Sequence, residues 1–177
     1  MNPKIAIFQH VPHEPSGYFE TIFRDRDIPF EYIRLYDINE VPRISNASHL
    51  VFMGGPMSVN DEDTYPWLKQ EKDLIRRSVK TGQNVLGVCL GAQLIASAHG
   101  AKVYPFVQET GWHVLNRATS ASGIFSSFPE LFHVFQLFLV FDHHVVDHVD
   151  LLTNLLPHVR VLTVLGTGGI GYELLMA

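Results

Sequence analysis

Four short apolar runs recur in the first hundred residues, and segments with helical spacing stand between them. Three of them are continuous, at residues 4–8, 49–55 and 84–89, and the fourth, at 30–37, alternates apolar and polar residues. Runs of this length are typical of strands in a buried sheet. Helical spacing is found over 17–25, over 65–82 with Gly82 at its end, and over 92–100 with Gly100 at its end. Strands that alternate with helices predict an α/β fold with a mainly parallel sheet and right-handed crossovers.

Composition limits the classes of protein to which the chain can belong. Its 177 residues suit one domain, so we treat 1–177 as a single unit, and 46% of them are hydrophobic. A net charge of -5 provides no basic surface for nucleic acid or for an anionic membrane. No signal peptide or membrane-spanning run is recognised. We therefore expect a cytoplasmic protein with no nucleic-acid or membrane partner.

A Gly-x-Cys-x-Gly motif surrounds the single cysteine, Cys89, between a predicted strand and a predicted helix. This is the pattern of a nucleophile elbow, in which the nucleophile occupies a strained turn at the end of a strand. Gly87 and Gly91 suit the turn because side chains there would clash where strand, turn and helix meet. The helix dipole would favour the thiolate of Cys89. A small buried hydrophobic residue is the alternative interpretation, and the flanking glycines favour the nucleophile.

Backbone N–H groups near the cysteine predict an oxyanion hole. The N–H of Leu90 would point towards the carbonyl oxygen of a bound substrate. A second donor would come from the loop 53–58, which leaves the neighbouring strand at the same edge of the sheet. With one cysteine, an internal disulfide and a cysteine-based zinc site are both excluded. We expect no metal and no cofactor.

Longer stretches resemble a known family. "GVCLGAQ" (87–93) and the preceding "VFMGGPMSVND" (51–61) are similar to the class I glutamine amidotransferase domain, and most similar to stand-alone members that resemble the glutaminase part of GMP synthase. "ETGW" (109–112) and "FPELFHVFQ" (128–136) resemble the same subgroup. The likeness covers residues 1–136.

This resemblance implies an open, flavodoxin-like sheet with helices on both faces, and hydrolysis of the side-chain amide of glutamine. Cys89 would attack the amide carbon and form a glutamyl thioester. Backbone N–H groups of Gly55 and Leu90 would hold the oxyanion. Gln93 would contact the substrate, and main-chain groups near Met57 would hold its amino-acid end. The partner is then a small molecule, glutamine or a γ-glutamyl compound, with any synthase or acceptor protein unidentified.

The resemblance stops after Gln136. The family takes its catalytic base from a His-x-Glu sequence near the C-terminus, and none occurs here: the single glutamate of this region, Glu173, has no histidine two residues before it. Residues 137–177 are rich in leucine, valine and histidine and contain one basic residue, Arg160. They indicate a frameshifted or a divergent tail. We therefore expect the sheet to be incomplete at its C-terminal side, with an exposed edge.

Several histidines are possible substitutes for the missing base. They are His143, His144, His148 and His158. His144 and His148 have the i, i+4 spacing of a metal pair on a helix, but surface histidines are the favoured interpretation. The remaining histidines show no recognisable partner pattern: His10, His13, His49, His99, His113 and His133. Three functions stay open: a glutamine amidohydrolase, a γ-glutamyl peptide hydrolase of the same superfamily, and a non-catalytic remnant that serves as a binding scaffold.

Overall fold

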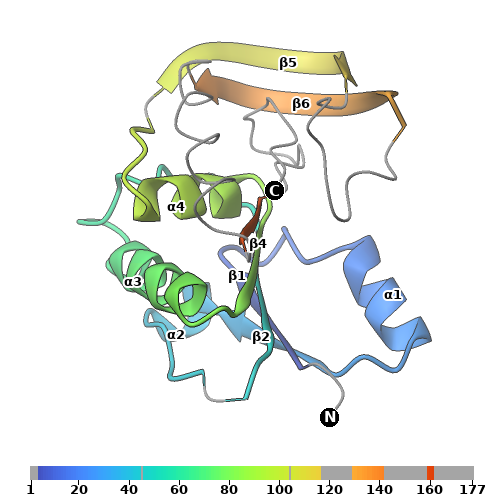
Figure 1. Ribbon diagram of the computed structural model, residues 1–177. Coiled ribbons are helices and arrows are strands. Elements are labelled where there is room, and N and C mark those ends of the chain that lie inside the picture. Colours follow the sequence, from blue (N-terminus) through green and yellow to red (C-terminus); the bar gives the residue numbers. More distant parts are fainter. Residues whose placement is uncertain (1–3, 45, 104, 117–128, 142–158, 162–177) are drawn as a thin grey trace.

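An open parallel sheet forms the centre of the molecule (Figure 1). The computed structural model describes residues 4–44, 46–103, 105–116, 129–141 and 159–161. The strands lie in the order β2-β1-β3-β4-β7, and each neighbouring pair is parallel. Their bounds are Ile5–Gln9 (β1), Phe30–Arg34 (β2), His49–Phe52 (β3), Asn84–Gly87 (β4) and Val159–Val161 (β7).

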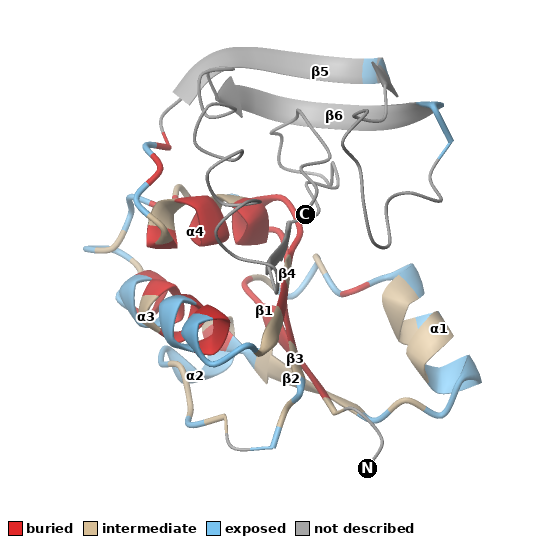
Figure 2. Cartoon of the chain, in the orientation of Figure 1, coloured by how far each residue is buried: buried red, intermediate tan, exposed pale blue. Residues whose placement is uncertain are grey.

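Helices cover both faces of this sheet, which confirms the predicted α/β fold. Helix α1 (Tyr18–Asp25) lies on one face, and α3 (Trp67–Lys80) and α4 (Leu90–Ala98) lie on the other (Figures 1 and 2). The second strand is shorter than predicted, because the chain turns after Arg34 into the short helix α2 (Leu35–Ile38). Helices α3 and α4 each end before a glycine with positive φ, Gly82 and Gly100. Both are the glycines that the sequence predicted.

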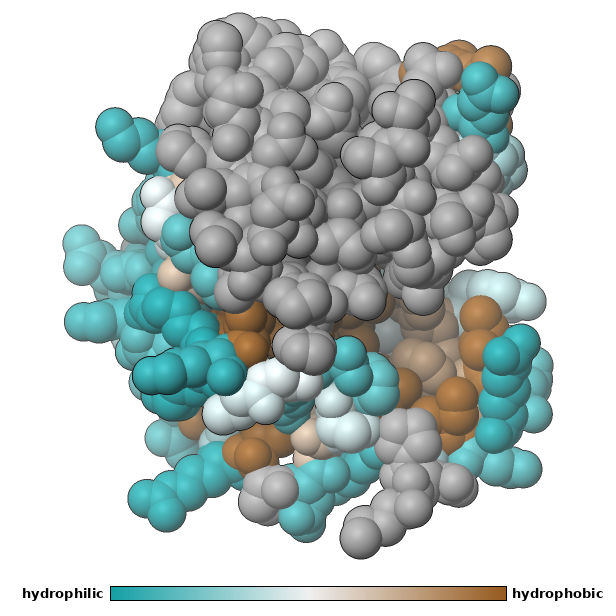
Figure 3. All heavy atoms as spheres, viewed as in Figure 1, coloured by the Kyte–Doolittle hydropathy of each residue, from teal (hydrophilic) through white to brown (hydrophobic). Residues whose placement is uncertain are grey.

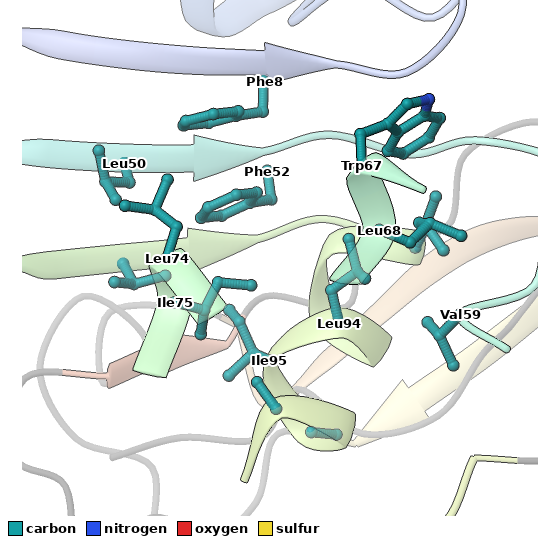
Figure 4. Packing of buried hydrophobic residues seen from close by; sticks show 14 of the residues in the cluster. Phe8, Leu50, Phe52, Val59, Trp67, Leu68, Leu74, Ile75, Leu94 and Ile95 are labelled. Carbon is teal, nitrogen blue, oxygen red and sulfur yellow. The ribbon is translucent and has the colours of Figure 1, made fainter. Parts of the chain in front are cut away.

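The main core lies between the sheet and helices α3 and α4 (Figure 4). Phe8 of β1 and Phe52 of β3 stack with ring centroids 4.5 Å apart, and Ile75, Leu94 and Ile95 pack around them from the helices. A smaller cluster fills the opposite face beneath α1. Because both faces are covered, the central strands read as continuous apolar runs in the sequence.

Helix α1 covers its face of the sheet less completely. None of its residues is fully buried, although Phe19 and Phe23 pack against the smaller cluster. In the space-filling view, hydrophilic side chains cover most of the described surface over α3, and apolar side chains are visible between α1 and the sheet (Figure 3). No helix in the described part of the chain is both long and apolar enough to cross a membrane.

Two further strands form a separate antiparallel ribbon beyond α4 (Figure 1). They are β5 (Pro105–Asn116) and β6 (Leu131–Phe141). Beyond β4, the described part of the parallel sheet continues only with the three residues of β7. The candidate histidines His143, His144, His148 and His158 lie outside the described residues, as does Glu173.

Candidate active site

Cys89 occupies a strained turn between β4 and α4. Its backbone angles are φ 53° and ψ -111°, a conformation that residues with a side chain rarely adopt. Two other non-glycine residues of the described chain have a positive φ, Asp27 and Asn39, and these residue types tolerate it better than cysteine does. The Cys89 side chain is buried, at 2% exposure. A strained cysteine at the carboxyl end of a parallel strand has the backbone geometry of a nucleophile elbow.

Gly87 and Gly91 allow the backbones around this turn to approach closely. A Cβ on Gly87 would lie 2.5 Å from the carbonyl carbon of Gly91, and a Cβ on Gly91 would overlap the carbonyl oxygen of Phe52. Both contacts are with backbone atoms, which cannot move aside as a flexible side chain does. The two glycines therefore allow α4 to begin directly against β3 and β4.

The loop that follows β3 lies against the turn. A Cβ on Gly54 would be 3.5 Å from the Cβ of Cys89, and one on Gly55 would be 3.0 Å from Cδ2 of Leu90. Among the described residues, the N–H groups of Gly55 and Leu90 donate no hydrogen bond. The structure thus places Gly54 beside Cys89 and Gly55 beside Leu90, and the role of the Gly55 and Leu90 N–H groups in an oxyanion hole stays a prediction.

Gln93 and Met57 lie beside the same turn in different ways. Gln93 is half-buried one helical turn after Cys89, and its N–H donates to the Cys89 carbonyl oxygen at 3.2 Å. The Met57 side chain is buried in the main core. Its sulfur would lie 2.6 Å from a Cβ on Gly55, so Met57 packs over the glycine loop. The predicted substrate contact concerns main-chain groups near Met57 and stays a prediction.

Sequence reasoning missed a buried pair beneath this loop, His10 and Glu71. His10 follows β1 directly, and its Nδ1 donates to the carbonyl oxygen of Gly54 at 2.9 Å. Its Nε2 lies 3.1 and 3.3 Å from the two carboxylate oxygens of Glu71. Both side chains are fully buried, and the imidazole stacks on Trp67. The sequence showed no partner pattern for His10, and the structure supplies its partners; it also gives hydrogen bonds to His49 and His99.

Electrostatics at His10 favour the protonated ring. Burial by itself would lower its pKa, but the Glu71 carboxylate, the Gly54 carbonyl and the charge of Glu14 together raise the pKa above its ordinary value of 6.5. Burial raises the pKa of Glu71, and the charge of His10 opposes part of this rise. Each partner thus favours the charged form of the other, in addition to the hydrogen bonds between them.

Helix α3 supplies a second support for the loop after β3. Lys72, the neighbour of Glu71, is buried, and its Nζ donates to the carbonyl oxygen of Val59 and to Oε1 of Glu62, both at 2.7 Å. Glu71 supports the start of the loop through His10, and Lys72 supports its later part. Two charged residues on the buried side of an amphipathic helix thus hold one loop in place.

Glu14 places a carboxyl group at the same site. Its Oε2 lies 2.5 Å from the position that a Cβ on Gly54 would occupy. The Cβ of Cys89 lies 3.5 Å from that same position. Partial burial raises the pKa of Glu14, and His13 and His10 counteract this rise by their charge. His10, Gly54 and Cys89 follow three adjacent strands, β1, β3 and β4, at their carboxyl ends. Ligands of open α/β sheets bind at this edge.

The family model for class-I glutamine amidotransferases matches residues 21–138 of this chain. The chain belongs to this family. The match ends two residues beyond Gln136, close to the point where the resemblance was expected to stop. It includes the turn at Cys89, the loop at Gly54 and Gly55, and Glu71, whereas His10 and Glu14 precede it.

Relatives of this chain include curated proteins and solved structures. The glutamine amidotransferase-like protein YfeJ of Salmonella typhimurium is 33% identical over 104 residues, which are 56% of this chain and 44% of YfeJ. A glutamine amidotransferase structure from Thermotoga maritima aligns with a TM-score of 0.73 and 32% identity, covering 80% of this chain and 63% of its own. This amidotransferase-family chain therefore spans less than half of YfeJ and less than two thirds of the Thermotoga protein.

A more distant likeness concerns the GMP synthase subgroup. A Thermoplasma acidophilum structure, which is named for a GMP synthase subunit, has a TM-score of 0.59 and 19% identity, over 77% of this chain and 64% of that chain. At this identity the likeness shows the fold alone. Among the described residues, no three histidine, cysteine or acidic side chains stand together as metal ligands would.

The buried pair predicts how the stability of the protein depends on pH. His10 has a raised pKa in the folded state, so its stabilising contribution is present below 6.5 and is lost as the pH rises through the raised value. Glu71 and Glu14 face this ring and cause the rise. We expect the free energy of unfolding from urea titrations to fall as the pH rises above 6.5 and through the raised pKa of His10. His10→Gln flattens this part of the curve, whereas an unchanged slope in the variant would contradict the assignment.

Proposed function

We propose that this amidotransferase-family protein hydrolyses the side-chain amide of glutamine to glutamate and ammonia through a thioester on Cys89. The observation that carries the proposal is the strained Cys89 turn packed against Gly54. Two N–H groups that donate no hydrogen bond among the described residues, those of Gly55 and Leu90, flank the turn. A nucleophile beside two backbone donors is the arrangement that acyl transfer requires.

The chemistry takes place in two steps. In the first, the Cys89 sulfur bonds to the side-chain carbonyl carbon of glutamine, and the oxyanion accepts hydrogen bonds from Gly55 and Leu90. The carbon–nitrogen bond then breaks, and ammonia leaves with the proton that the thiol gave up. In the second, a water molecule attacks the thioester, the carbon–sulfur bond breaks, and the sulfur regains a proton. Gln93 and the main chain at Met57 orient the substrate in both steps.

Proton transfer needs a carrier, and His10 is not suited to this role. Both of its ring nitrogens are engaged, Nδ1 by Gly54 and Nε2 by Glu71. Loss of one member of a catalytic unit costs several orders of magnitude in turnover. We therefore expect hydrolysis by this chain to be slow compared with that by a complete cysteine–histidine pair.

The test is to incubate the purified protein with glutamine and to measure ammonia and glutamate together. We expect the two products in equal amounts, and covalent labelling of Cys89 by a diazoketone analogue of glutamine, located by mass spectrometry. A γ-glutamyl dipeptide tested in parallel separates an amide hydrolase from a peptide hydrolase. A folded protein that releases no ammonia, and whose Cys89 resists the diazoketone, would contradict the proposal and favour a binding scaffold.

A further inference from the structure

We propose that His10, anchored by Glu71, is a positioning residue that holds the Gly54–Gly55 peptide in the orientation needed for oxyanion binding. The inference rests on the proposed function, since it assigns a device to the same site. His10 acts on the peptide and does not touch the reacting atoms.

The argument begins with the peptide itself. The carbonyl oxygen of Gly54 and the N–H of Gly55 belong to one planar unit, and the described residues contain no cis peptide bond. In a trans peptide these two groups point in opposite directions. The 2.9 Å hydrogen bond from His10 to the Gly54 oxygen therefore also directs the Gly55 N–H away from His10.

The peptide needs a contact that holds its orientation because it joins two glycines. We call the hydrogen bond from His10 to the Gly54 oxygen the latch. Glycine has no Cβ and rotates through backbone angles closed to other residues. A half-turn of this peptide would exchange its two groups and would present a carbonyl oxygen to the developing negative charge. Hydrogen bonding to the carbonyl opposes that rotation. It also polarises the peptide, which makes the N–H a better donor.

The position of His10 is itself determined by its surroundings. The Gly54 oxygen accepts and cannot donate, so Nδ1 must carry a proton, and Glu71 meets the other nitrogen with both oxygens. Trp67 stacks on the ring, with centroids 5.4 Å apart and planes at 23°. A fully buried polar pair rarely adds net stability. The contact that this pair makes with the loop is the hydrogen bond from His10 to the Gly54 oxygen.

Two substitutions separate the latch from general packing. His10→Asn places an amide nitrogen near the position of Nδ1 and keeps a donor for Gly54. His10→Gln places one near Nε2, which keeps the contact with Glu71 and loses the donor for Gly54. Both remove the ring stacked on Trp67. His49→Gln is the matched control. His49 is the first residue of β3, at the end of the strand away from Gly54, and like His10 it forms hydrogen bonds through both ring nitrogens.

The readout compares two reactions of Cys89. A diazoketone analogue of glutamine places its carbonyl in the oxyanion hole, whereas iodoacetamide alkylates the sulfur by direct displacement. We expect His10→Gln to slow the diazoketone reaction about 10²-fold, the cost of a misplaced catalytic group, and to leave iodoacetamide alkylation near the wild-type rate. His10→Asn and His49→Gln retain most of the diazoketone rate. Equal losses in both His10 variants, or no loss in His10→Gln, would overturn the proposal.

A second measurement keeps the latch testable if the enzyme proposal fails. In a ¹⁵N–¹H spectrum, the Gly55 amide resonance is expected to move in His10→Gln and to stay near its wild-type position in His10→Asn. A wild-type protein inert to glutamine and to the diazoketone would overturn the proposed function. The Gly55 resonance would then decide the latch, and a resonance unmoved in His10→Gln would overturn it.

Discussion

Replacing Cys89 with alanine is expected to reduce ammonia release from glutamine to the uncatalysed background rate. The sulfur is the atom that bonds to substrate, and without it no thioester forms. The oxyanion donors remain, because the N–H groups of Gly55 and Leu90 are backbone groups. A coupled assay of ammonia at saturating glutamine measures the effect. Persistent release at the wild-type rate would show that the activity belongs to another residue or a contaminant.

Cys89→Gly is the matched control for the turn. Alanine keeps the strain of φ 53° and ψ -111°, whereas glycine adopts such angles without a steric cost. Both variants lack the sulfur and should be inactive. We expect the glycine variant to exceed the alanine variant in free energy of unfolding by about 1 kcal/mol. If the alanine variant were the more stable, the turn would be unstrained and the elbow assignment would lose its backbone argument.

The sheet and the elbow could be predicted because their signals are local. Strands buried on both faces read as apolar runs, and α3 and α4 each close with a glycine. The elbow was similarly local, since Gly87, Cys89 and Gly91 stand within five consecutive residues. In each case the physical requirement acts on neighbours in the chain. The end of β2 was misplaced because alternation continues past Arg34 into the short helix α2.

The buried pair could not be predicted because its members are 61 positions apart. Glu71 and Lys72 belong to "KQEKD", a stretch whose composition indicates a solvent-exposed helix face. Their burial depends on how α3 packs against the loop after β3. One signal was available: His10, Gly54 and Cys89 follow predicted parallel strands, whose carboxyl ends meet at one edge. A histidine directly after a buried strand was thus a candidate for the site.

Gly91→Ala is expected to lower the free energy of unfolding by about 3 kcal/mol or more, which is more than the other variants proposed. In an ordinary helix this change stabilises by up to about 1 kcal/mol. Here the added Cβ would overlap the carbonyl oxygen of Phe52 and lie 2.7 Å from its carbonyl carbon. Phe52 is fully buried and stacks on Phe8, so its backbone has little room to retreat. Urea unfolding followed by circular dichroism measures the change.

Gly100→Ala separates the overlap from the general cost of replacing a glycine. A Cβ on Gly100 meets nothing within 4 Å, although φ is 92°. That variant therefore incurs backbone strain alone, about 1 kcal/mol, and Gly91→Ala must exceed it clearly. Similar losses would show that α4 can shift away from β3 at little cost. Such a shift would also carry Cys89 and Leu90 away from Gly54 and Gly55, so the close contact at Gly91 sets the spacing on which the proposed chemistry depends.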